Sequence, residues 1–133
     1  MYPEGNSPAV VDDRPLLAFT VYRWPGTTFE EFADHYKKVH AQIGKRLPGV
    51  IWYESFMNRK AAGGWPVIGA APTPDAFVVM KFESREALEN VGNSEAWDEA
   101  AKDDIGFCSH FEIFEVDRYT WIPDPDRPDA FVV

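Results

Sequence analysis

The chain has 133 residues, enough for one domain with a hydrophobic core. Its net charge is −9 and its pI is about 4.7, with no basic cluster, which argues against nucleic acid and anionic membranes as partners. The single cysteine, Cys108, excludes an intramolecular disulfide and a cysteine-based zinc site.

Residues 1–14 are acidic, contain prolines and show no hydrophobic period, so we expect an N-terminal arm there. They have neither the basic nor the apolar region of a signal peptide, and no run in the chain approaches the length of a transmembrane helix. We therefore expect a cytoplasmic protein with its folded domain at residues 15–120 and a C-terminal tail at residues 121–133.

Residues 16–24, LLAFTVYRW, form a predicted strand that a Pro-Gly pair ends. Residues 27–47 follow as a predicted amphipathic helix, with Thr27 or Thr28 as N-cap and a second Pro-Gly pair as its stop. At about 100° per residue, one face of this helix is apolar and the opposite face is charged. Within roughly 60° of Tyr36, the apolar face holds Phe29, Phe32, Ala33, Val39, His40, Ile43 and Leu47.

This helix carries two of the three histidines. His40 lies within the apolar face, where an imidazole is either a hydrogen-bonded core residue or part of a pocket. His35 lies roughly 100° from Tyr36 on the same calculation, so we expect the two histidines to occupy different faces. That placement argues against a metal-binding pair, which usually needs the i, i+4 spacing.

The rest of the domain alternates between strands and helices. The remaining predicted elements are, in order, strand 49–57, a long loop over 59–75, strand 76–82, a helix that Ser84 caps and Gly92 interrupts, its continuation from Ser94, and strand 110–118. The complete order is β-α-β-β-α-β. This is the order of a ferredoxin-like α+β fold, with a four-stranded antiparallel sheet and both helices on one face.

The strands at 16–24 and 76–82 are apolar on both faces. The face away from the helices would therefore leave a large apolar patch on a monomer. We expect a homodimer in which these faces pack together. The apolar tip at residues 130–133 either straps onto the partner subunit or is frayed.

The segment from the first helix into the next strand carries a recognisable pattern. It runs Phe32-x-x-x-Tyr36-x-x-x-His40-Ala41-x-Ile43 and then Leu47-Pro48-Gly49-Val50-x-x-Tyr53. With these residues the chain resembles the EthD family of the dimeric α+β barrel superfamily, over about residues 16–120. It departs from the family pattern at Tyr36, Gln42 and Phe56, where Trp, Pro and a polar residue are usual, and this suggests a pocket suited to an apolar ligand.

The resemblance implies a homodimeric barrel with a pocket between the sheet and the helices of each protomer. Relatives include cofactor-free cyclases, dehydratases, isomerases and monooxygenases acting on aromatic polyketides or lactones. The resemblance favours His40 as a catalytic acid or base. Tyr53 is the second catalytic candidate, as a donor to a carbonyl or enolate oxygen, with a packed aromatic as the alternative. The expected substrate-binding residues are Tyr22, Trp24, Phe32, His35, Tyr36, Ile43 and Trp97.

Other polar residues have structural explanations beside functional ones. We expect His35 at the pocket rim or the surface, with a second proton carrier as the alternative, and His110 at the start of a strand. Asp103 and Asp104 are solvated charges unless one of them pairs with a histidine. Strand alternation lets one of the two aromatics at 52–53 face the helices, and we choose Tyr53.

No phosphate-binding loop, nucleophile elbow or zinc motif is present, so we expect no cofactor and no metal. The sequence favours a cofactor-independent, lyase-like enzyme that dehydrates, cyclises or isomerises a small hydrophobic aromatic, polyketide or lactone-type metabolite. His40 would abstract a proton next to a carbonyl, and Tyr53 would stabilise the enolate. The alternatives are a cofactor-free monooxygenase acting on a phenolic or anthrone substrate and a non-catalytic dimer that binds a small molecule.

Overall fold

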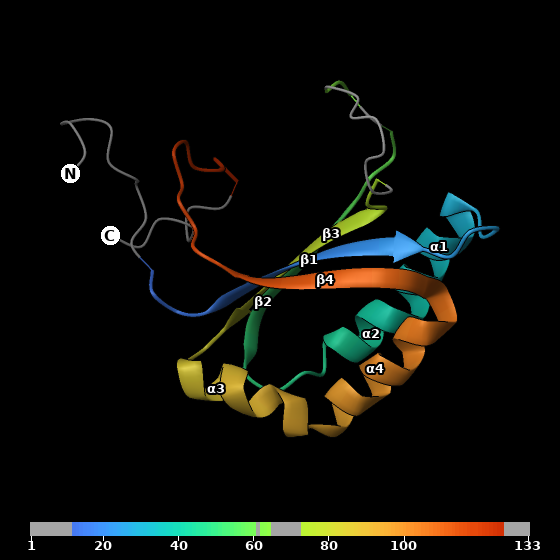
Figure 1. Cartoon of the computed structure of the whole chain (residues 1–133). Helices are drawn as coiled ribbons and strands as arrows, with labels where there is room; N and C mark the ends of the chain where they lie inside the picture. Colours follow the sequence, from blue (N-terminus) through green and yellow to red (C-terminus); the bar gives the residue numbers. More distant parts are fainter. Residues whose placement is uncertain (1–11, 61, 65–72, 127–133) are drawn as a thin grey trace.

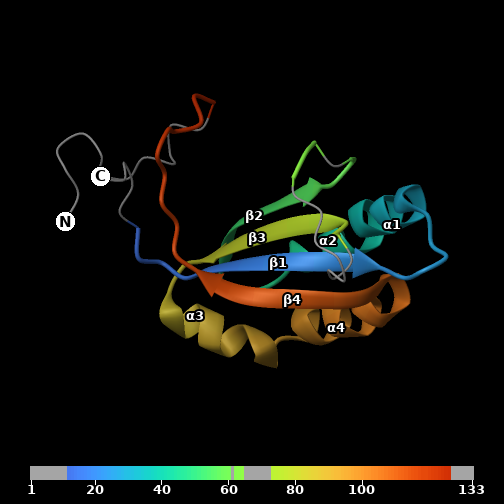
Figure 2. The same cartoon turned by 45° about the horizontal axis from the view of Figure 1, so that its top comes forward.

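The computed structural model of the chain describes residues 12–60, 62–64 and 73–126. Within them, four strands form one antiparallel sheet in the order β2-β3-β1-β4, seen side by side in Figure 2. The strands are β1 (Leu16–Arg23), β2 (Val50–Met57), β3 (Ala76–Phe82) and β4 (Cys108–Val116). Helices α2 (Ala41–Gly44), α3 (Arg85–Asn90) and α4 (Glu95–Phe107) lie together on one side of the sheet (Figure 1). The fold is the predicted ferredoxin-like α+β arrangement.

The first helical segment is made of three pieces. It begins as α1 (Phe29–His35), passes through a π-helical turn (Tyr36–His40) and ends as α2 (Ala41–Gly44). Thr28 is the N-cap, since its hydroxyl accepts from the backbone N–H of Glu31 and the Glu31 carboxylate accepts from the backbone N–H of Thr28. The structure therefore confirms a helix in this region, but the prediction of one continuous α-helix is wrong at the π turn.

The second helical segment is divided where the sequence predicted. A 3₁₀ turn (Val91–Asn93) separates α3 (Arg85–Asn90) from α4 (Glu95–Phe107). Ser84 and Ser94 cap the two helices by accepting from backbone N–H groups three residues ahead. Helix α4 runs to Phe107, and strand β4 begins directly after it at Cys108, two residues before the predicted start at His110.

The hydrophobic core lies between the helices and the inner face of the sheet. Leu17 and Val21 of β1 and Val78, Met80 and Phe82 of β3 form its sheet side. The helix side includes Phe32, which is fully buried and packs on Phe107 with 5.6 Å between the ring centroids. A helix layer covering one sheet face accounts for the buried residues at every second position of β3.

The outer face of the sheet exposes several large apolar side chains, as the strand patterns predicted. Phe56 and Phe77 are direct neighbours in the β2–β3 register, and they are 48% and 44% exposed. Phe114 of β4 is 49% exposed and pairs with Ala18, on this same face. The predicted apolar tip at 130–133 and most of the predicted N-terminal arm lie outside the described residues. No helix in the described part of the chain is long and apolar enough to cross a membrane.

Candidate active site

A cavity of about 170 Å³ lies between the inner face of the sheet and the helices. Most of its wall is apolar, with side chains from β1, β3, β4 and α4. The apolar part includes Phe19, Val21, Val78, Met80, Trp97 and Phe107. Four lining residues carry ionisable groups, namely Tyr36, His40, Tyr53 and Asp104. A small set of polar groups in an otherwise apolar cavity is the usual composition of a small-molecule site.

The His40 imidazole is held between two consecutive carboxylates of α4. Its Nδ1 lies 2.9 Å from Oδ2 of Asp103 in a hydrogen bond, and its Nε2 lies 3.3 Å from Oδ1 of Asp104. The ring packs on Phe107 at 4.7 Å between centroids, and the side chain is 16% exposed. His40 is therefore a partly buried residue with both nitrogens next to a carboxyl group.

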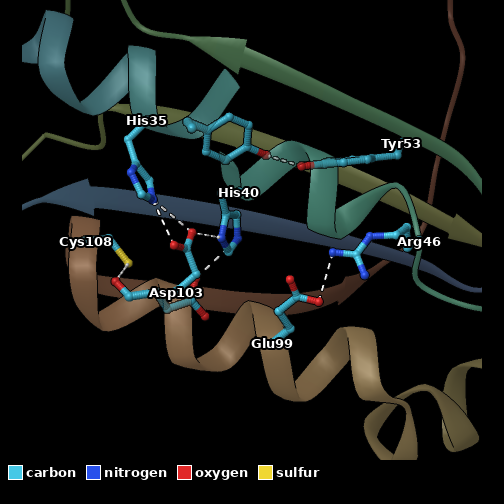
Figure 3. Close-up of polar contacts among 9 residues, drawn as sticks. His35, His40, Arg46, Tyr53, Glu99, Asp103 and Cys108 are labelled. Atoms are coloured by element: carbon cyan, nitrogen blue, oxygen red, sulfur yellow. Dashed lines mark hydrogen bonds and ion pairs between the residues drawn. The ribbon is translucent and has the colours of Figure 1, made fainter. Parts of the chain in front are cut away.

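His35 contacts the same carboxylate, which corrects the expectation that the two histidines occupy different faces. Its Nε2 lies 2.9 and 3.0 Å from the two carboxylate oxygens of Asp103, and Figure 3 shows both imidazoles directed at this group. The π turn explains the difference, because its i→i+5 hydrogen bonds bring residues five apart to one face. Within the described residues, no group of three or more His, Cys, Asp or Glu side chains has the arrangement of a metal site.

Asp104 occupies an unusual environment for a carboxyl group. Burial raises its pKa from the ordinary 3.8 to about 6, opposed by the charge of His40 and assisted by the charge of Asp103. Its side chain is 22% exposed and lines the cavity beside His40. A carboxyl group that titrates near neutral pH can hold or release a proton under ordinary cellular conditions.

Two phenols meet on another part of the cavity wall. The Tyr36 hydroxyl lies 2.7 Å from the Tyr53 hydroxyl and 2.8 Å from the hydroxyl of Ser55. Burial raises the pKa of both tyrosines, so both keep their protons near neutral pH. When Ser55 donates to Tyr36 and Tyr36 donates to Tyr53, the Tyr53 O–H is left to donate into the cavity.

Gly44, at the end of α2, lets the Tyr53 ring lie against the helix. A Cβ at this position would lie 2.8 Å from Cε2 and 3.1 Å from the hydroxyl oxygen of Tyr53. Such distances are shorter than van der Waals contact, so a larger residue would displace the ring. The glycine thereby determines where the phenol stands.

The structure brings together only some of the predicted substrate-binding residues. Tyr36 and Trp97 line the cavity with His40 and Tyr53, whereas Phe32 and Ile43 are buried and do not line it. His35 does not line the cavity, and its imidazole is hydrogen-bonded to Asp103.

Tyr22 and Trp24 do not line this cavity. Tyr22 pairs in register with His110 on the outer face of the sheet, and its hydroxyl donates to Glu112. Trp24 lies beyond the end of β1, where its indole N–H donates to the backbone carbonyl of Ile105. Both line a separate hollow that His110 also lines. With Leu17 and Val21 buried in the core on the inner face of β1, the alternate residues of this strand point the other way.

Several residues of the site carried little sequence signal. Asp104 was expected to be a solvated charge unless it paired with a histidine, and Ser55, Gly44 and Phe107 had no assigned role. Only the possibility that an aspartate at this end of the second helix pairs with a histidine pointed here. The structure shows that pairing for both Asp103 and Asp104.

Comparisons with known proteins agree with this architecture. The family model described as the EthD domain matches residues 24–110, more than half of the chain. A structure of an EthD (ethyl tert-butyl ether D) family protein from Bacillus halodurans is 17% identical, covers 77% of this chain and 98% of its own chain, and has a TM-score of 0.59. No curated protein is a significant match.

Two further solved structures share the fold. One is a dimeric protein of unknown function and ferredoxin-like fold from Bacteroides fragilis, 9% identical, covering 88% of this chain and 100% of its own, with a TM-score of 0.58. The other is a putative antibiotic biosynthesis monooxygenase from Bacteroides thetaiotaomicron, 9% identical, covering 79% of this chain and 89% of its own, with a TM-score of 0.54. At such identities the likeness concerns the fold alone.

Proposed function

The chain belongs to the EthD family, and on that premise we propose that it is a cofactor-independent enzyme that moves protons on a small, uncharged, largely apolar carbonyl compound. The observation that carries this proposal is the pair formed by His40 and Asp104 at the wall of the apolar cavity, with 3.3 Å between Nε2 and Oδ1. Proton transfer by positioned side chains needs no bound cofactor when the groups titrate near the working pH.

The pair would act as the base. His40 takes a proton at Nε2 from the carbon next to the substrate carbonyl, and the imidazolium formed then faces Asp104. Burial raises the pKa of Asp104 to about 6, so this carboxyl is ionised at neutral pH and stabilises the new positive charge. The same pair returns the proton in the second half of the reaction.

The phenol of Tyr53 would receive the charge that develops on the carbonyl oxygen. Its pKa is raised by burial, so it acts as a donor rather than a base. A positioned O–H that donates to an enolate oxygen inside an apolar cavity is worth more than one in water. Tyr36, whose hydroxyl lies 2.7 Å from that of Tyr53, would fix the direction of this donor by donating its own O–H to the Tyr53 oxygen.

Three outcomes of such an enolate are chemically balanced. In a β-hydroxy ketone, the β-hydroxyl leaves with the proton from the base as water, and a conjugated ketone forms. In an isomerisation, the proton returns to a different carbon of the same molecule. In a cyclisation, the enolate carbon attacks a second carbonyl of the same chain, and the new alkoxide takes the proton. All three use the same base and the same oxyanion donor.

The cavity also limits the substrate. Its volume of about 170 Å³ is close to that of the ~150 Å³ cavity that holds a benzene molecule in an engineered protein. No described residue that lines it is a lysine or an arginine, so an anionic group would have no counter-charge beside Asp104. The part of the substrate that reacts is therefore about one ring in size and uncharged, such as an aromatic ketone, a short polyketide or a lactone.

The enzyme would work as a homodimer. The outer face of the sheet exposes Phe56, Phe77 and Phe114, and a patch of this kind usually marks an interface. A second copy of the same face is its most direct partner in a symmetric pair. The cavity lies on the opposite side of the sheet, so each protomer would keep its own site.

A panel assay tests the reaction class. Single-ring β-hydroxy ketones, diketones, lactones and phenols are incubated with the protein in air and under argon, and the products are identified by mass spectrometry. Loss of one water, or a change of structure at constant mass, with equal yield under argon supports the proposal. Gain of oxygen that argon abolishes would assign a monooxygenase, and ligands that bind without any conversion would assign a binding protein.

A further inference from the structure

Asp103 makes contacts that the proposed reaction does not use. Its carboxylate receives Nε2 of His35 at 2.9 and 3.0 Å and Nδ1 of His40 at 2.9 Å, yet it does not line the cavity. The side chain is 16% exposed. One carboxylate therefore holds two imidazoles, one of which reaches the cavity.

The backbone is built to make this double contact. In a continuous α-helix, residues five apart would lie about 140° from each other. The π turn between His35 and His40 removes that offset, and π turns often occur at functional sites. Phe107, one turn after Asp103 on α4, packs on both imidazoles at 5.0 and 4.7 Å.

The two helical segments are also joined by a second polar contact. Arg46, just after α2, forms an ion pair with Glu99 of α4 at 2.9 Å, and Figure 3 shows this pair on the far side of His40 from His35. Partly buried ion pairs are weak evidence for stability, because desolvation offsets the attraction between the charges. A contact that only stabilised the fold would not need two imidazoles on one carboxylate. A role in positioning His40 accounts for both of them.

We infer that Asp103 is a positioning residue that holds neutral His40 in the Nδ1–H tautomer, so that Nε2 carries the basic lone pair at the cavity. His35 is the second donor to Asp103 and holds its carboxylate in the orientation that reaches His40. An ionised carboxylate only accepts, so each facing nitrogen must carry a hydrogen. The inference rests on the proposed function, in which Nε2 is the base.

Asp104 is the group that opposes this arrangement. Its carboxylate lies on the Nε2 side of His40 and would attract a hydrogen there. The contact with Asp103 is shorter, 2.9 against 3.3 Å, and of the two it alone has hydrogen-bond geometry. Asp103 therefore determines the tautomer, and its removal would release His40 towards Asp104.

The tautomer can be measured directly by long-range ¹H–¹⁵N NMR without any substrate. The chain has three histidines, so the imidazole signals are few, and His110 on the outer sheet face is an internal control. In the neutral imidazole, measured at alkaline pH, His40 is expected to favour the Nδ1–H form roughly tenfold or more, as a hydrogen bond to a carboxylate provides.

Four variants complete the test. Asp103→Ala and Asp103→Asn should move His40 largely to the Nε2–H form, whereas Asp104→Asn should leave it as Nδ1–H. His35→Phe keeps a ring against Phe107 but removes the donor to Asp103, so it should produce a mixture of the two His40 tautomers. His35→Gln restores a donor through its amide and should shift this mixture back towards the Nδ1–H form. Circular dichroism verifies folding, and the near-isosteric Asp103→Asn remains informative if Asp103→Ala fails to fold.

A wild-type His40 in the Nε2–H form would overturn the inference, as would Asp103 variants that leave the tautomer unchanged. If His40 keeps its tautomer in His35→Phe, His35 has no part in positioning Asp103. These results are separate from the proposed function. A protein with the expected tautomer that moves no proton on any carbonyl compound would refute the enzyme proposal alone, and an active enzyme with the opposite tautomer would refute only the positioning role.

Discussion

At the residue scale, the site depends on where a few polar atoms stand in an apolar cavity. His40 was singled out from its place on the apolar helix face, and the structure puts its imidazole at the cavity wall. The carboxyl beside it, Asp104, could not be chosen from the sequence, because an aspartate near the end of a helix is usually solvated. Its raised pKa comes from burial that only the folded chain provides.

The substitution Asp104→Asn is expected to alter how stability depends on pH. Burial raises the pKa of Asp104 in the folded state to about 6, above the ordinary 3.8, so the folded chain binds more protons than the unfolded chain between these values. The stability that this group contributes is complete at low pH and is lost as the pH rises through 6. Asp104→Asn carries a side chain that does not titrate, so its stability does not fall in this way as the pH rises.

The melting temperature of Asp104→Asn relative to wild type should therefore rise between pH 4 and pH 7.5. Solvent screening of this partly exposed carboxyl reduces the effect to about 1 kcal/mol, or about 3–5 °C for a chain of this size. Thermal unfolding followed by circular dichroism at both pH values measures it. A difference that stays constant or falls with pH would contradict the assignment of the buried carboxyl.

Gly44→Ala is expected to displace the Tyr53 phenol. The new Cβ would lie 2.8 Å from the ring, so the ring or α2 must shift. We expect a loss of about 1–3 kcal/mol in the free energy of unfolding, together with a lower rate on any substrate whose oxyanion Tyr53 stabilises. Chemical denaturation and steady-state kinetics measure the two effects.

Gly106→Ala is the matched control, because no side-chain or distant atom lies within 4 Å of its Cβ position in α4. It should be neutral or stabilising by roughly 0.5–1 kcal/mol, as alanine is the better helix former. Equal effects of the two substitutions would show that contact with Tyr53 is not what excludes a side chain at Gly44.

At the element scale, most of the fold was predictable, and the errors have specific causes. Apolar alternation and the Pro-Gly stops located the strands because strand period and turn chemistry are local. The prediction that His35 and His40 occupy different faces was wrong because a π turn changes the helical period within five residues. The residue types in this segment give no sign of such a turn. Tyr22 and Trp24 do not reach the cavity. The sequence could not show this, because both faces of β1 carry apolar residues and periodicity alone does not tell which one the helices cover.

The division of the second helical segment can be tested through its caps. Ser94 has an extended backbone, and its hydroxyl accepts from the N–H of Trp97. Ser94→Ala should therefore lower the free energy of unfolding by about 1 kcal/mol. If residues 85–107 formed one continuous helix instead, alanine would stabilise it, so the sign of the change in a urea titration distinguishes the two structures. Lys102→Ala, inside α4, serves as the neutral control.

At the scale of the whole molecule, the helices cover one face of the sheet and leave the other apolar. This division places the cavity and the proposed dimer interface on opposite sides. The two-faced strand pattern was visible in the sequence, and the apolar outer face is present in the structure. The solved protein from Bacteroides fragilis that shares this fold is itself described as dimeric.

Phe77→Glu is expected to convert the proposed dimer to a monomer, because it places a charge among the exposed aromatics of the outer face. Light scattering should give twice the chain mass of 15.1 kDa for the wild type and the chain mass for the variant. Ile105→Glu is the control, since Ile105 is 74% exposed on α4, and it should stay dimeric. Phe114→Glu repeats the test from β4 if Phe77→Glu does not fold. A monomeric wild type would contradict the shared-sheet assembly.

The central claim, that His40 moves a proton at an apolar cavity, is tested most directly by hydrogen–deuterium exchange on carbon. Single-ring ketones and lactones are incubated with the protein in D₂O, and loss of the α-proton signal is followed by NMR. The wild type should accelerate exchange for at least one of them, His40→Gln should lower that rate by about 10²–10⁴-fold, and His110→Gln should leave it unchanged. Exchange that is equal in wild type and His40→Gln, or absent with every compound that the cavity binds, would contradict the account.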